Sequence, residues 1–452
     1  MHILKGYTKQ EISWMMYDWA NSAHSVIIVT LLPIFFDTVA GYTADSVSSM
    51  STWGYATSIA MLIVALAAPF LGVFGDIRGM RKKLFSFFML LGVAACAGMA
   101  FTPVMDFTSG PVAAGKVASL ILVLYIVSVI GFDASAIYYD AFLTDVTIED
   151  RMDKVSTMGY GLGYIGGSTI PLLIFLIMNL VGVPMLTCLA FVFGLTAVWW
   201  LAFSLPLLKN CEQTSGKPYE KGDVARSIKG VGTTIKEIIA NKPMLIYILS
   251  YFFYIDGVHT VISMATTYGT NLGLDSTGMM LALLLVQILG LPFCLLYIKC
   301  SEKFGARTMV GFGICVYMFI CIFAFFMNSL WQFWVLAVLC ATSQGGIQAL
   351  SRSMYGKLIP DKDRSGEFFG FFDIFGKFSS IMGPALVGVV SSVVANGMLG
   401  VQGLTAQTAT AEQIDAINAQ SSHYGILSII IIIIVGAVLY FGFLPKAEHA
   451  KQ

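Results

Sequence analysis

Residues 423–444 read HYGILSIIIIIIVGAVLYFGFL, a run without Asp, Glu, Lys or Arg. A helix needs about 20 apolar residues to cross the hydrocarbon core of a bilayer, so this run predicts a transmembrane helix. Its apolar residues are continuous rather than alternating, which argues against a strand of a membrane β-barrel. The stretch therefore places the chain among the all-α integral membrane proteins.

Eleven further apolar runs precede it along the chain. They lie near Ser13–Phe36, Trp53–Phe74, Leu84–Pro103, Val117–Tyr138, Thr157–Leu180, Pro184–Leu207, Met244–Thr266, Thr277–Ile298, Arg307–Met327, Trp331–Leu350 and Phe368–Val394. Twelve spans of about 20 residues use about 240 positions. That number agrees with a chain of 452 residues of which 57% are hydrophobic, so we predict twelve transmembrane helices.

The composition excludes most other classes. Charged residues make up 12% of the chain, whereas soluble domains carry about 25%. The 26 Lys and Arg balance the 26 Asp and Glu, so no charge excess indicates a nucleic-acid partner. The eight cysteines form no C-x-x-C pair, and none falls in an outside loop. We therefore expect no disulfide, no metal and no other cofactor.

The basic residues predict the orientation. Of the 26 Lys and Arg, only Lys116 lies in an outside loop and Lys377 lies within a span, so the other 24 share the side of the N-terminus. This bias predicts that both termini are cytoplasmic and that the chain is a multi-pass protein of the cytoplasmic membrane. The first residues lack the apolar core and cleavage site of a signal peptide, so we expect no cleaved leader.

The longest predicted cytoplasmic connection divides the spans six and six. We expect an N-terminal bundle at 1–207, a linker at 208–242 with an amphipathic helix around 224–239, and a C-terminal bundle at 243–452. The halves carry matching residues: Asp150, Gly163 and Pro171 recur as Asp363, Gly376 and Pro384 at one constant offset of 213 residues. Such a repeat predicts two pseudo-symmetric six-helix bundles.

Several motifs resemble a known family. Residues 72–83, GVFGDIRGMRKK, are similar to the loop between helices 2 and 3 of the major facilitator superfamily. Longer stretches resemble its Atg22-like vacuole effluxers and their bacterial relatives: YDWANSA at 17–23, YDAFL at 139–143, GLGYIGG at 161–167, YIDGV at 254–258, GGIQALSR at 345–352 and GKFSSIMGP at 376–384. The resemblance implies a secondary transporter that works by alternating access, and the fungal members export amino acids.

Polar residues on helices 1 and 7 are the first site candidates. Asp18, Asn21 and His24 follow one another at intervals of three residues on helix 1, and Asp256 and His259 repeat that spacing on helix 7. The resemblance implies that helices 1, 4, 7 and 10 line the central cavity, so both sets would meet substrate or a proton. The alternative is that these groups hold neighbouring helices together by hydrogen bonds.

Other residues near the expected cavity are aromatic or neutral. Tyr251 and Tyr254 lie one turn apart just before Asp256, and Gln344 and Gln348 lie one turn apart on helix 10. The two amides would supply neutral hydrogen bonds to a zwitterion. The glycines of 159–167 predict close helix packing rather than phosphate binding, and Trp53, Trp199, Trp200, Trp331 and Trp334 are interpreted as lipid-facing or belt residues.

Charged residues near the cytoplasmic ends are the gating candidates. By the resemblance, Asp76, in a loop with Arg78 and Arg81, should meet the N-terminus of helix 11 near 366–369 when the inner side is closed. Asp140 and Arg352, at corresponding ends of helices 4 and 10, could close the inner gate as an ion pair. Asp133 lies two turns deeper than Asp140 and could join that network. Asp373 and Lys377 are interpreted as a structural ion pair on helix 11.

These features predict a secondary transporter for a small polar organic solute. Amino acids are the first candidates, exported by a monomer with coupling to a proton or Na⁺ possible. The alternatives are a lipid or drug exporter of the same fold, a membrane-embedded enzyme with paired aspartates, or a sensor. The enzyme interpretation lacks a metal-ligand cluster and an activated nucleophile. The outside loop 395–422 carries Thr410-Ala-Glu-Gln413, which predicts a capping box before a short helix through Ala419.

Overall fold

The computed structural model describes residues 4–43, 49–218, 223–403, 408 and 410–444. Within these residues, twelve helices are long and apolar enough to cross a membrane, as the sequence predicted. Each predicted run coincides with one of them, although the runs at 53–74, 184–207, 307–327 and 423–444 pass the end of the spanning stretch by one or two residues. Most helices extend beyond the apolar run into polar residues, because hydropathy marks the hydrocarbon core and not the helix end.

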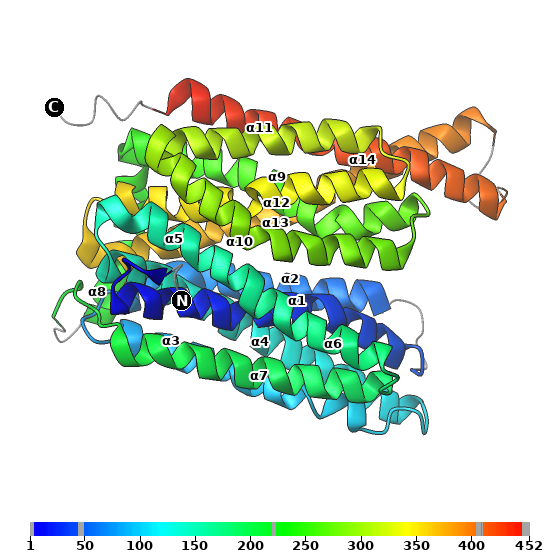
Figure 1. The fold of residues 1–452 in the computed structure, drawn as a ribbon, viewed down its shortest axis with the longest axis horizontal. Helices are drawn as coiled ribbons and strands as arrows, with labels where there is room; N and C mark the ends of the chain where they lie inside the picture. The colour runs from blue at the N-terminus through cyan, green and yellow to red at the C-terminus, as the bar shows by residue number, and fades with distance from the viewer. Residues whose placement is uncertain (1–3, 44–48, 219–222, 404–407, 409, 445–452) are drawn as a thin grey trace. The chain divides into compact units, whose positions relative to one another are not determined.

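The first half of the chain supplies six spans and a linker helix (Figure 1). Five spans are single helices, and the fifth span is α5 and α6 joined by a π-helical turn. The spans are α1 (Lys9–Ala40), α2 (Ser49–Gly75), α3 (Arg81–Met99), α4 (Pro111–Val146), α5 (Glu149–Gly163) with η3 (Tyr164–Thr169) and α6 (Ile170–Leu180), and α7 (Met185–Asn210). The linker helix is α8 (Asp223–Ala240), which confirms the amphipathic helix expected around 224–239.

The second half supplies six more spans. They are α9 (Lys242–Asn271), α10 (Ser276–Phe304), α11 (Ala306–Phe325), α12 (Leu330–Leu358), α13 (Ser365–Val401) and α14 (Ala411–Val438), the last continued by a π-helical turn at Leu439–Phe443. The N-terminus of α14 has the predicted capping box, with Thr410 accepting from the Gln413 amide. The prediction of a short helix through Ala419 is wrong, because α14 continues unbroken into the twelfth span.

The chain divides into two compact units. Unit 1 comprises residues 1–234 and 359–374, and unit 2 comprises residues 235–358 and 375–452. In unit 1, α1 packs on α7, and α4 packs on both α2 and α3. In unit 2, α9 packs on α14, and α12 packs on both α10 and α11. The first span thus packs on the sixth and the fourth on the second and third in each unit. The expected division into bundles at 1–207 and 243–452 stays a prediction.

Glycines of the fifth span allow α1 to approach closely, which confirms the packing role predicted for 159–167. A Cβ at Gly166 would lie 2.0 Å from the Trp19 ring, and one at Gly163 would lie 2.6 Å from Ser22 Oγ. Such contacts are shorter than any side chain permits, so larger residues would separate the helices. At the other end of this pair, Arg151 on α5 binds both carboxylate oxygens of Glu11 on α1 at 2.7 Å.

Candidate functional site

A fully buried arginine lies at the end of unit 1 where α1 begins and α2 ends, which we call the linker end. Arg81, with 0% of its surface exposed, is the first residue of α3. Its guanidinium lies 2.9 Å from Asp76 Oδ1 and 2.5 Å from Asp145 Oδ2. It also donates to Ser365 Oγ at 2.9 Å and Ser215 Oγ at 3.2 Å. The planar guanidinium suits this arrangement, because its donors reach several acceptors at fixed angles.

Asp76 also binds the first turn of α13. Its Oδ1 accepts from the Gly366 amide at 2.7 Å, and its Oδ2 accepts from the Glu367 amide at 2.8 Å. The first amides of a helix have no partner within the helix and carry partial positive charge, so a carboxylate there is stabilised. The structure therefore contains the contact predicted between Asp76 and residues near 366–369. The gating role of this contact stays a prediction.

Glycines bring α2 and the start of α13 into backbone contact. A Cβ at Gly72 would lie 2.2 Å from the Gly366 carbonyl oxygen, and one at Gly366 would lie 2.6 Å from the Gly72 carbonyl oxygen. One turn further on, a Cβ at Gly370 would lie 2.5 Å from the Ala68 carbonyl oxygen. No side chain fits at these three positions, so the contact between Asp76 and the α13 amides depends on them.

The linker covers this cluster. Asp145 Oδ1 accepts from the amide and hydroxyl of Ser215 at 2.9 and 2.7 Å. The Gly216 amide donates to Asp363 Oδ1 at 2.8 Å, and Gly216 has a φ of 107°, a conformation that favours glycine. The Arg78 amide donates to the Lys217 carbonyl at 2.9 Å. The linker segment 215–217 is thus hydrogen-bonded to a residue that follows α2, to one at the end of α4 and to one that precedes α13.

The structure separates the charged residues predicted at this end. Arg78 is exposed and contributes its backbone, whereas Arg81 is the buried cation. Asp145, Ser215 and Ser365 were missed by the sequence reasoning. The available signal for Asp145 was a second acidic residue, five positions after Asp140, at the end of the same apolar helix. Asp140 lies in unit 1 and Arg352 in unit 2, and their pairing stays a prediction.

Burial changes the acidity of Asp76. Removal from water raises the pKa of its carboxyl from 3.8 to about 7, against the opposing effects of Arg81 and the two α13 amides. With both aspartates ionised, Arg81 faces two negative charges, and one proton makes the trio neutral. Asp76 is therefore the group at this end that takes up a proton near neutral pH when it is buried.

Among the helix 1 candidates, His24 is buried inside unit 1. Its Nε2 lies 3.2 Å from Ser128 Oγ, and its ring stacks on Phe132 at 4.7 Å between centroids. Trp200 packs against it at 5.2 Å and is 0% exposed, so the prediction of Trp200 as a belt residue is wrong. Trp200 fits there because Gly92 leaves space for its ring.

Asp18, Asn21 and Asp133 are also buried in unit 1. Asp18 lies against α5, where a Cβ at Gly159 would come within 2.5 Å of Asp18 Oδ2. Asp133 lies on α4. These positions place the three polar groups among the spans, as expected, and leave their contact with substrate or a proton as a prediction.

In unit 2, Asp256 is fully buried on α9, and its two carboxylate oxygens differ in their hydrogen-bond partners. Oδ1 accepts from the Gly383 amide on α13 at 2.9 Å and lies 3.5 Å from Thr260 Oγ1. Oδ2 has no hydrogen-bond partner among the described residues. A Cβ at Gly383 would lie 1.8 Å from Thr260 Oγ1, so glycine is required for this approach. Thus in each unit the aspartate of the first span lies against a glycine of the fifth.

The aromatic candidates of α9 occupy different environments. Tyr254 is 0% exposed, and its hydroxyl lies 2.6 Å from Ser351 Oγ on α12. Its ring meets the Tyr440 ring edge-on. Tyr251 lies near α13, where a Cβ at Gly376 would be 3.2 Å from its hydroxyl. His259 is half-buried. Tyr254 is therefore engaged in packing between helices of unit 2.

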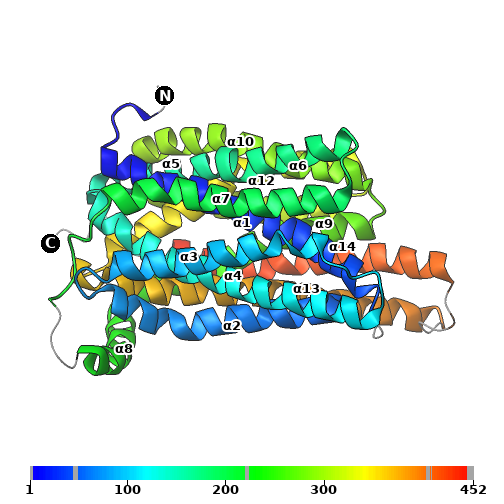
Figure 2. The same cartoon turned by 90° about the horizontal axis from the view of Figure 1, so that it is seen from below.

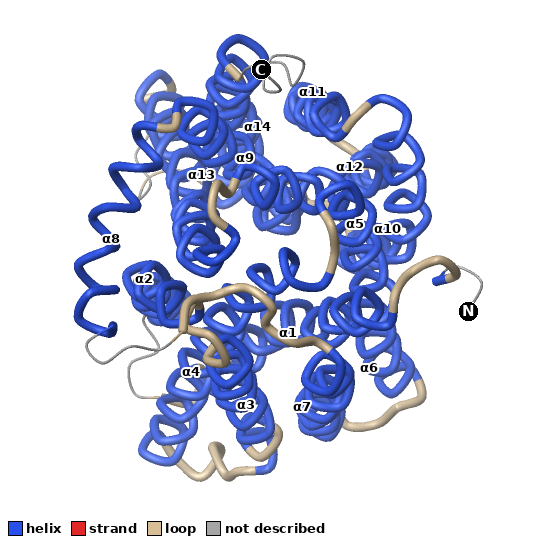
Figure 3. Tube along the Cα trace, turned by 90° about the vertical axis from the view of Figure 1, so that its left-hand side faces the viewer, coloured by secondary structure: helices blue, strands red, loops and turns tan. Residues whose placement is uncertain are grey.

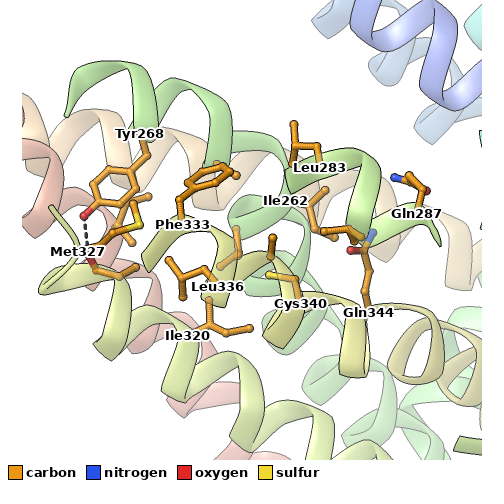
Figure 4. Close-up of a pocket in the computed structure, with 16 residues that line it drawn as sticks. Ile262, Tyr268, Leu283, Gln287, Ile320, Met327, Phe333, Leu336, Cys340 and Gln344 are labelled. Carbon is orange, nitrogen blue, oxygen red and sulfur yellow. Dashed lines mark hydrogen bonds between the residues drawn. The ribbon is translucent and has the colours of Figure 1, made fainter. Parts of the chain in front are cut away.

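A mainly apolar cavity lies inside unit 2 (Figure 4). Residues of α9, α10, α11, α12 and α14 line it. Gln287 and Gln344 lie at one end, with Tyr268 and Met327 at the other. The predicted candidate Gln344 therefore lines a cavity, while Gln348 is not among the lining residues. Gln287 Oε1 is buried without a hydrogen-bond partner among the described residues.

Two predictions of other kinds remain. Asp373 and Lys377 lie one turn apart on α13, and their ion pair stays a prediction. Within the residues that the structure describes, no group of three His, Cys, Asp or Glu side chains is arranged to hold a metal ion.

Known proteins resemble this chain in sequence. The family model described as "Vacuole effluxer Atg22 like" matches residues 41–150 and 144–402. An uncharacterized MFS-type transporter, YxiO of Bacillus subtilis (strain 168), is 40% identical over 98% of this chain and 96% of its own length. Autophagy-related protein 22-1 of Penicillium rubens is 25% identical over 55% of this chain and 46% of its own length.

Solved transporters share the fold. The proton:xylose symporter XylE superposes with a TM-score of 0.69 at 14% identity, covering 97% of this chain and 95% of its own. A bacterial homologue of the iron transporter ferroportin superposes with a TM-score of 0.61 at 14% identity, covering 95% of this chain and 98% of its own. At such identities the likeness concerns the fold alone. The chain belongs to the Atg22-like family and is a multi-pass membrane transporter of the major facilitator superfamily.

Proposed function

We propose that this secondary transporter exports a small polar organic solute, amino acids first, across the cytoplasmic membrane by alternating access, with a proton as the coupling ion. The observation that carries the proposal is Asp256, a fully buried carboxylate with one oxygen held by the Gly383 amide and the other without a partner among the described residues. A buried carboxylate lowers its free energy by binding a cation, and the candidates are a proton and a substrate ammonium group. The description of the matching family as an effluxer supports the outward direction, and amino acids are the cargo that the resemblance to the fungal members implies.

The linker end supports the alternating-access part of the proposal. Asp76 joins Arg81 to the first turn of α13, and the glycines at 72, 366 and 370 permit backbone contact there. The backbone contacts and the hydrogen bonds of Asp76 all require the same close spacing of α2 and the start of α13. Moving the two helices apart would therefore break all of them together. We assign this contact to the state in which the cytoplasmic side is closed. Transport then requires its opening and closing in each cycle.

Proteoliposomes test the proposed function. Purified protein is reconstituted and loaded with a mixture of amino acids, and the exit of each is followed with and without an imposed pH gradient. The expected result is gradient-dependent exit of at least one amino acid that is lost in Asp256→Asn. Liposomes without protein are the control. Exit of none of the amino acids from liposomes that contain correctly folded protein would overturn the assignment of this cargo.

The cavity of unit 2 supports a second candidate, an exporter of apolar or amphipathic compounds. Its lining is mostly Leu, Ile, Val, Phe and Met, with amides at one end. A ligand with an apolar body and one hydrogen-bond donor would fit this lining, since Gln287 Oε1 needs a donor. Competition separates the candidates. The probe is an apolar amine. Binding of this amine that is lost when Gln344 is replaced, with amino acid exit unaffected by the amine, would favour this second function.

A further inference from the structure

A pocket lined by hydroxyl and amide groups lies at one end of unit 2, and we call it the hydroxyl pocket. It forms where the last turns of α9 meet the second half of α13 and the first half of α14. The end of α13 and the start of α14 lie side by side in two views, and the view along the spans shows α9 next to these helices (Figures 1, 2 and 3). Its hydrogen-bonding side chains include Thr267, Asn271, Ser391, Ser392, Ser421 and Ser422.

These side chains have hydrogen-bonding capacity that the protein leaves unused. Asn271 Nδ2 donates to Ser422 Oγ at 2.9 Å, whereas Asn271 Oδ1 has no partner among the described residues. The hydroxyls of Ser391 and Ser392 also make no hydrogen bond within the part of the chain that the structure describes. No charged side chain is among the described residues that line the pocket. Uncharged groups that both donate and accept match the hydroxyls of a sugar or glycerol better than they match an ion.

The apolar cavity of unit 2 adjoins the hydroxyl pocket. Tyr268 and Ile426 line both spaces. Along α12 the cavity runs from Phe333 to Gln344, about 16 Å at 1.5 Å per residue (Figure 4). Between these ends its lining consists of Val, Ile, Leu, Ala and Met side chains and the thiol of Cys340. A polar pocket and a long apolar cavity therefore meet inside one unit.

Tyr268 separates the two spaces and is held by two other helices. Its hydroxyl donates to the Ala324 carbonyl of α11 at 2.5 Å. The hydroxyl oxygen also lies 2.6 Å from Nδ1 of His423 on α14. A tyrosine has one proton to donate, so Nδ1 of His423 must be the donor in this second bond. Both bonds must break before the Tyr268 ring can turn and join the pocket to the cavity.

We propose that the hydroxyl pocket and the apolar cavity form one binding site for an amphipathic molecule with an uncharged hydroxyl-bearing head and an apolar chain. The head is bound by Ser391, Ser392 and Asn271, and the chain lies in the cavity once Tyr268 has turned. A soluble amphiphile and a membrane lipid share this chemistry. The site deepens the second candidate function, on which it rests for the cavity, by naming the head of the ligand. Binding itself does not require that the ligand is exported.

Two native cysteines test the site in the unmodified protein. Cys340 lines the cavity, and Cys315 is exposed on α11. The protein is placed in nanodiscs and treated with an apolar maleimide, and peptide mass spectrometry follows each cysteine separately. We expect octyl glucoside, below its micelle concentration, to slow the labelling of Cys340 several-fold and to leave Cys315 unchanged. Glucose alone should have no effect, and octanol should have a smaller one. Equal effects of octyl glucoside on both cysteines, or none on Cys340, would overturn the proposal.

The source of the ligand is tested with the same labelling. One set of nanodiscs contains a monoacylglycerol in its lipid, and the other receives octyl glucoside from water. Protection of Cys340 in the first set identifies a membrane lipid, and protection in the second set alone identifies a soluble amphiphile. Protection in neither set would contradict the site.

Variants separate the head pocket from the cavity. Ser391→Ala combined with Ser392→Ala should reduce the protection by octyl glucoside to the level given by octanol. Thr270→Val is the matched control, because Thr270 is an exposed hydroxyl of α9 that does not line the pocket. Retention of full protection in the double variant would show that the hydroxyl pocket does not bind the head.

The role of Tyr268 has its own variant. Tyr268→Phe keeps the ring and removes both hydrogen bonds, so labelling of Cys340 without ligand should become faster. Tyr254→Phe is the control, since its hydroxyl binds Ser351 away from both spaces. Equal labelling in the two variants would contradict the separation of the spaces by Tyr268. Failure of amino acid exit from liposomes would instead count against the proposed cargo and leave these labelling results unaffected.

Discussion

Asp76 Oδ1 lies 2.7 Å from the backbone nitrogen of Gly366, although 290 residues separate them along the chain. The second oxygen of the same carboxylate receives the next amide of the helix, and Arg81 approaches from α3. A single side chain therefore binds a helix N-terminus and a buried guanidinium together. Variants of these residues can show whether this contact is the closed gate.

Replacing Asp76 with Asn should favour the open state of the linker end. An amide nitrogen in the place of Oδ2 cannot accept from the Glu367 amide, whereas a protonated carboxyl oxygen can. We expect slower transport with substrate binding retained, together with faster labelling of a cysteine that replaces the fully buried Ser365. Unchanged transport and labelling would remove the gating role.

Acid should favour the closed contact. Burial raises the pKa of Asp76 to about 7, so closing takes up a proton when the pH lies between about 4 and 7. The stabilisation of the closed state by the proton on Asp76 is fully present below pH 4 and is lost as the pH rises through 7. Labelling at the linker end should therefore slow as the pH falls from 8 to 5.5. Asp76→Asn should abolish this pH dependence, and a dependence that persists in the variant would assign it to another group.

Arg81→Ala should destabilise the protein strongly. The change leaves the carboxylates of Asp76 and Asp145 buried without their cation, and breaking a buried ion pair in this way costs about 3–5 kcal/mol. Arg81→Lys should recover only part of this free energy, because one ammonium group cannot reach all the acceptors. Thermal unfolding in nanodiscs measures both variants. A melting temperature for Arg81→Ala equal to that of the unmodified protein would contradict this prediction.

Gly366→Ala should separate α2 from the start of α13. The added Cβ would lie 2.6 Å from the Gly72 carbonyl oxygen and 2.7 Å from Asp76 Oδ1. Gly397→Ala on the same helix is the matched control, since a Cβ there meets nothing within 4 Å and alanine favours a helix by up to about 1 kcal/mol. We expect slow transport for the first variant and normal transport for the second. Similar rates for the two would show that backbone contact is not required.

The sequence was sufficient for the membrane class, the twelve spans and the linker helix, because each depends on local hydropathy and periodicity. It could not identify Asp145 as a partner of Arg81, since that pairing joins residues 64 positions apart and requires the packed end of α4. Trp200 was misassigned for a similar reason. Its position near a span end resembles that of belt residues, and only the space left by Gly92 places it inside.

Asp256 shows the same limit and defines the last prediction. Its depth on α9 could be estimated from the sequence, but the Gly383 amide that binds Oδ1 could not. The absence of a side chain at Gly383 gives the carboxylate access to the backbone of α13. One oxygen is thereby fixed and the other left for a cation.

Asp256→Asn should distinguish a proton site from a cargo site. The amide keeps an oxygen for the Gly383 donor but carries no charge and does not titrate. If Oδ2 binds the coupling proton, the variant should bind cargo with normal affinity and lose the pH dependence of transport. If Oδ2 binds the cargo ammonium group, binding itself should be lost. Thr260→Val is the control, because it alters the weaker contact to Oδ1 and preserves the charge. Transport by Asp256→Asn at the normal rate and with the normal pH profile would show that Asp256 is a packing group.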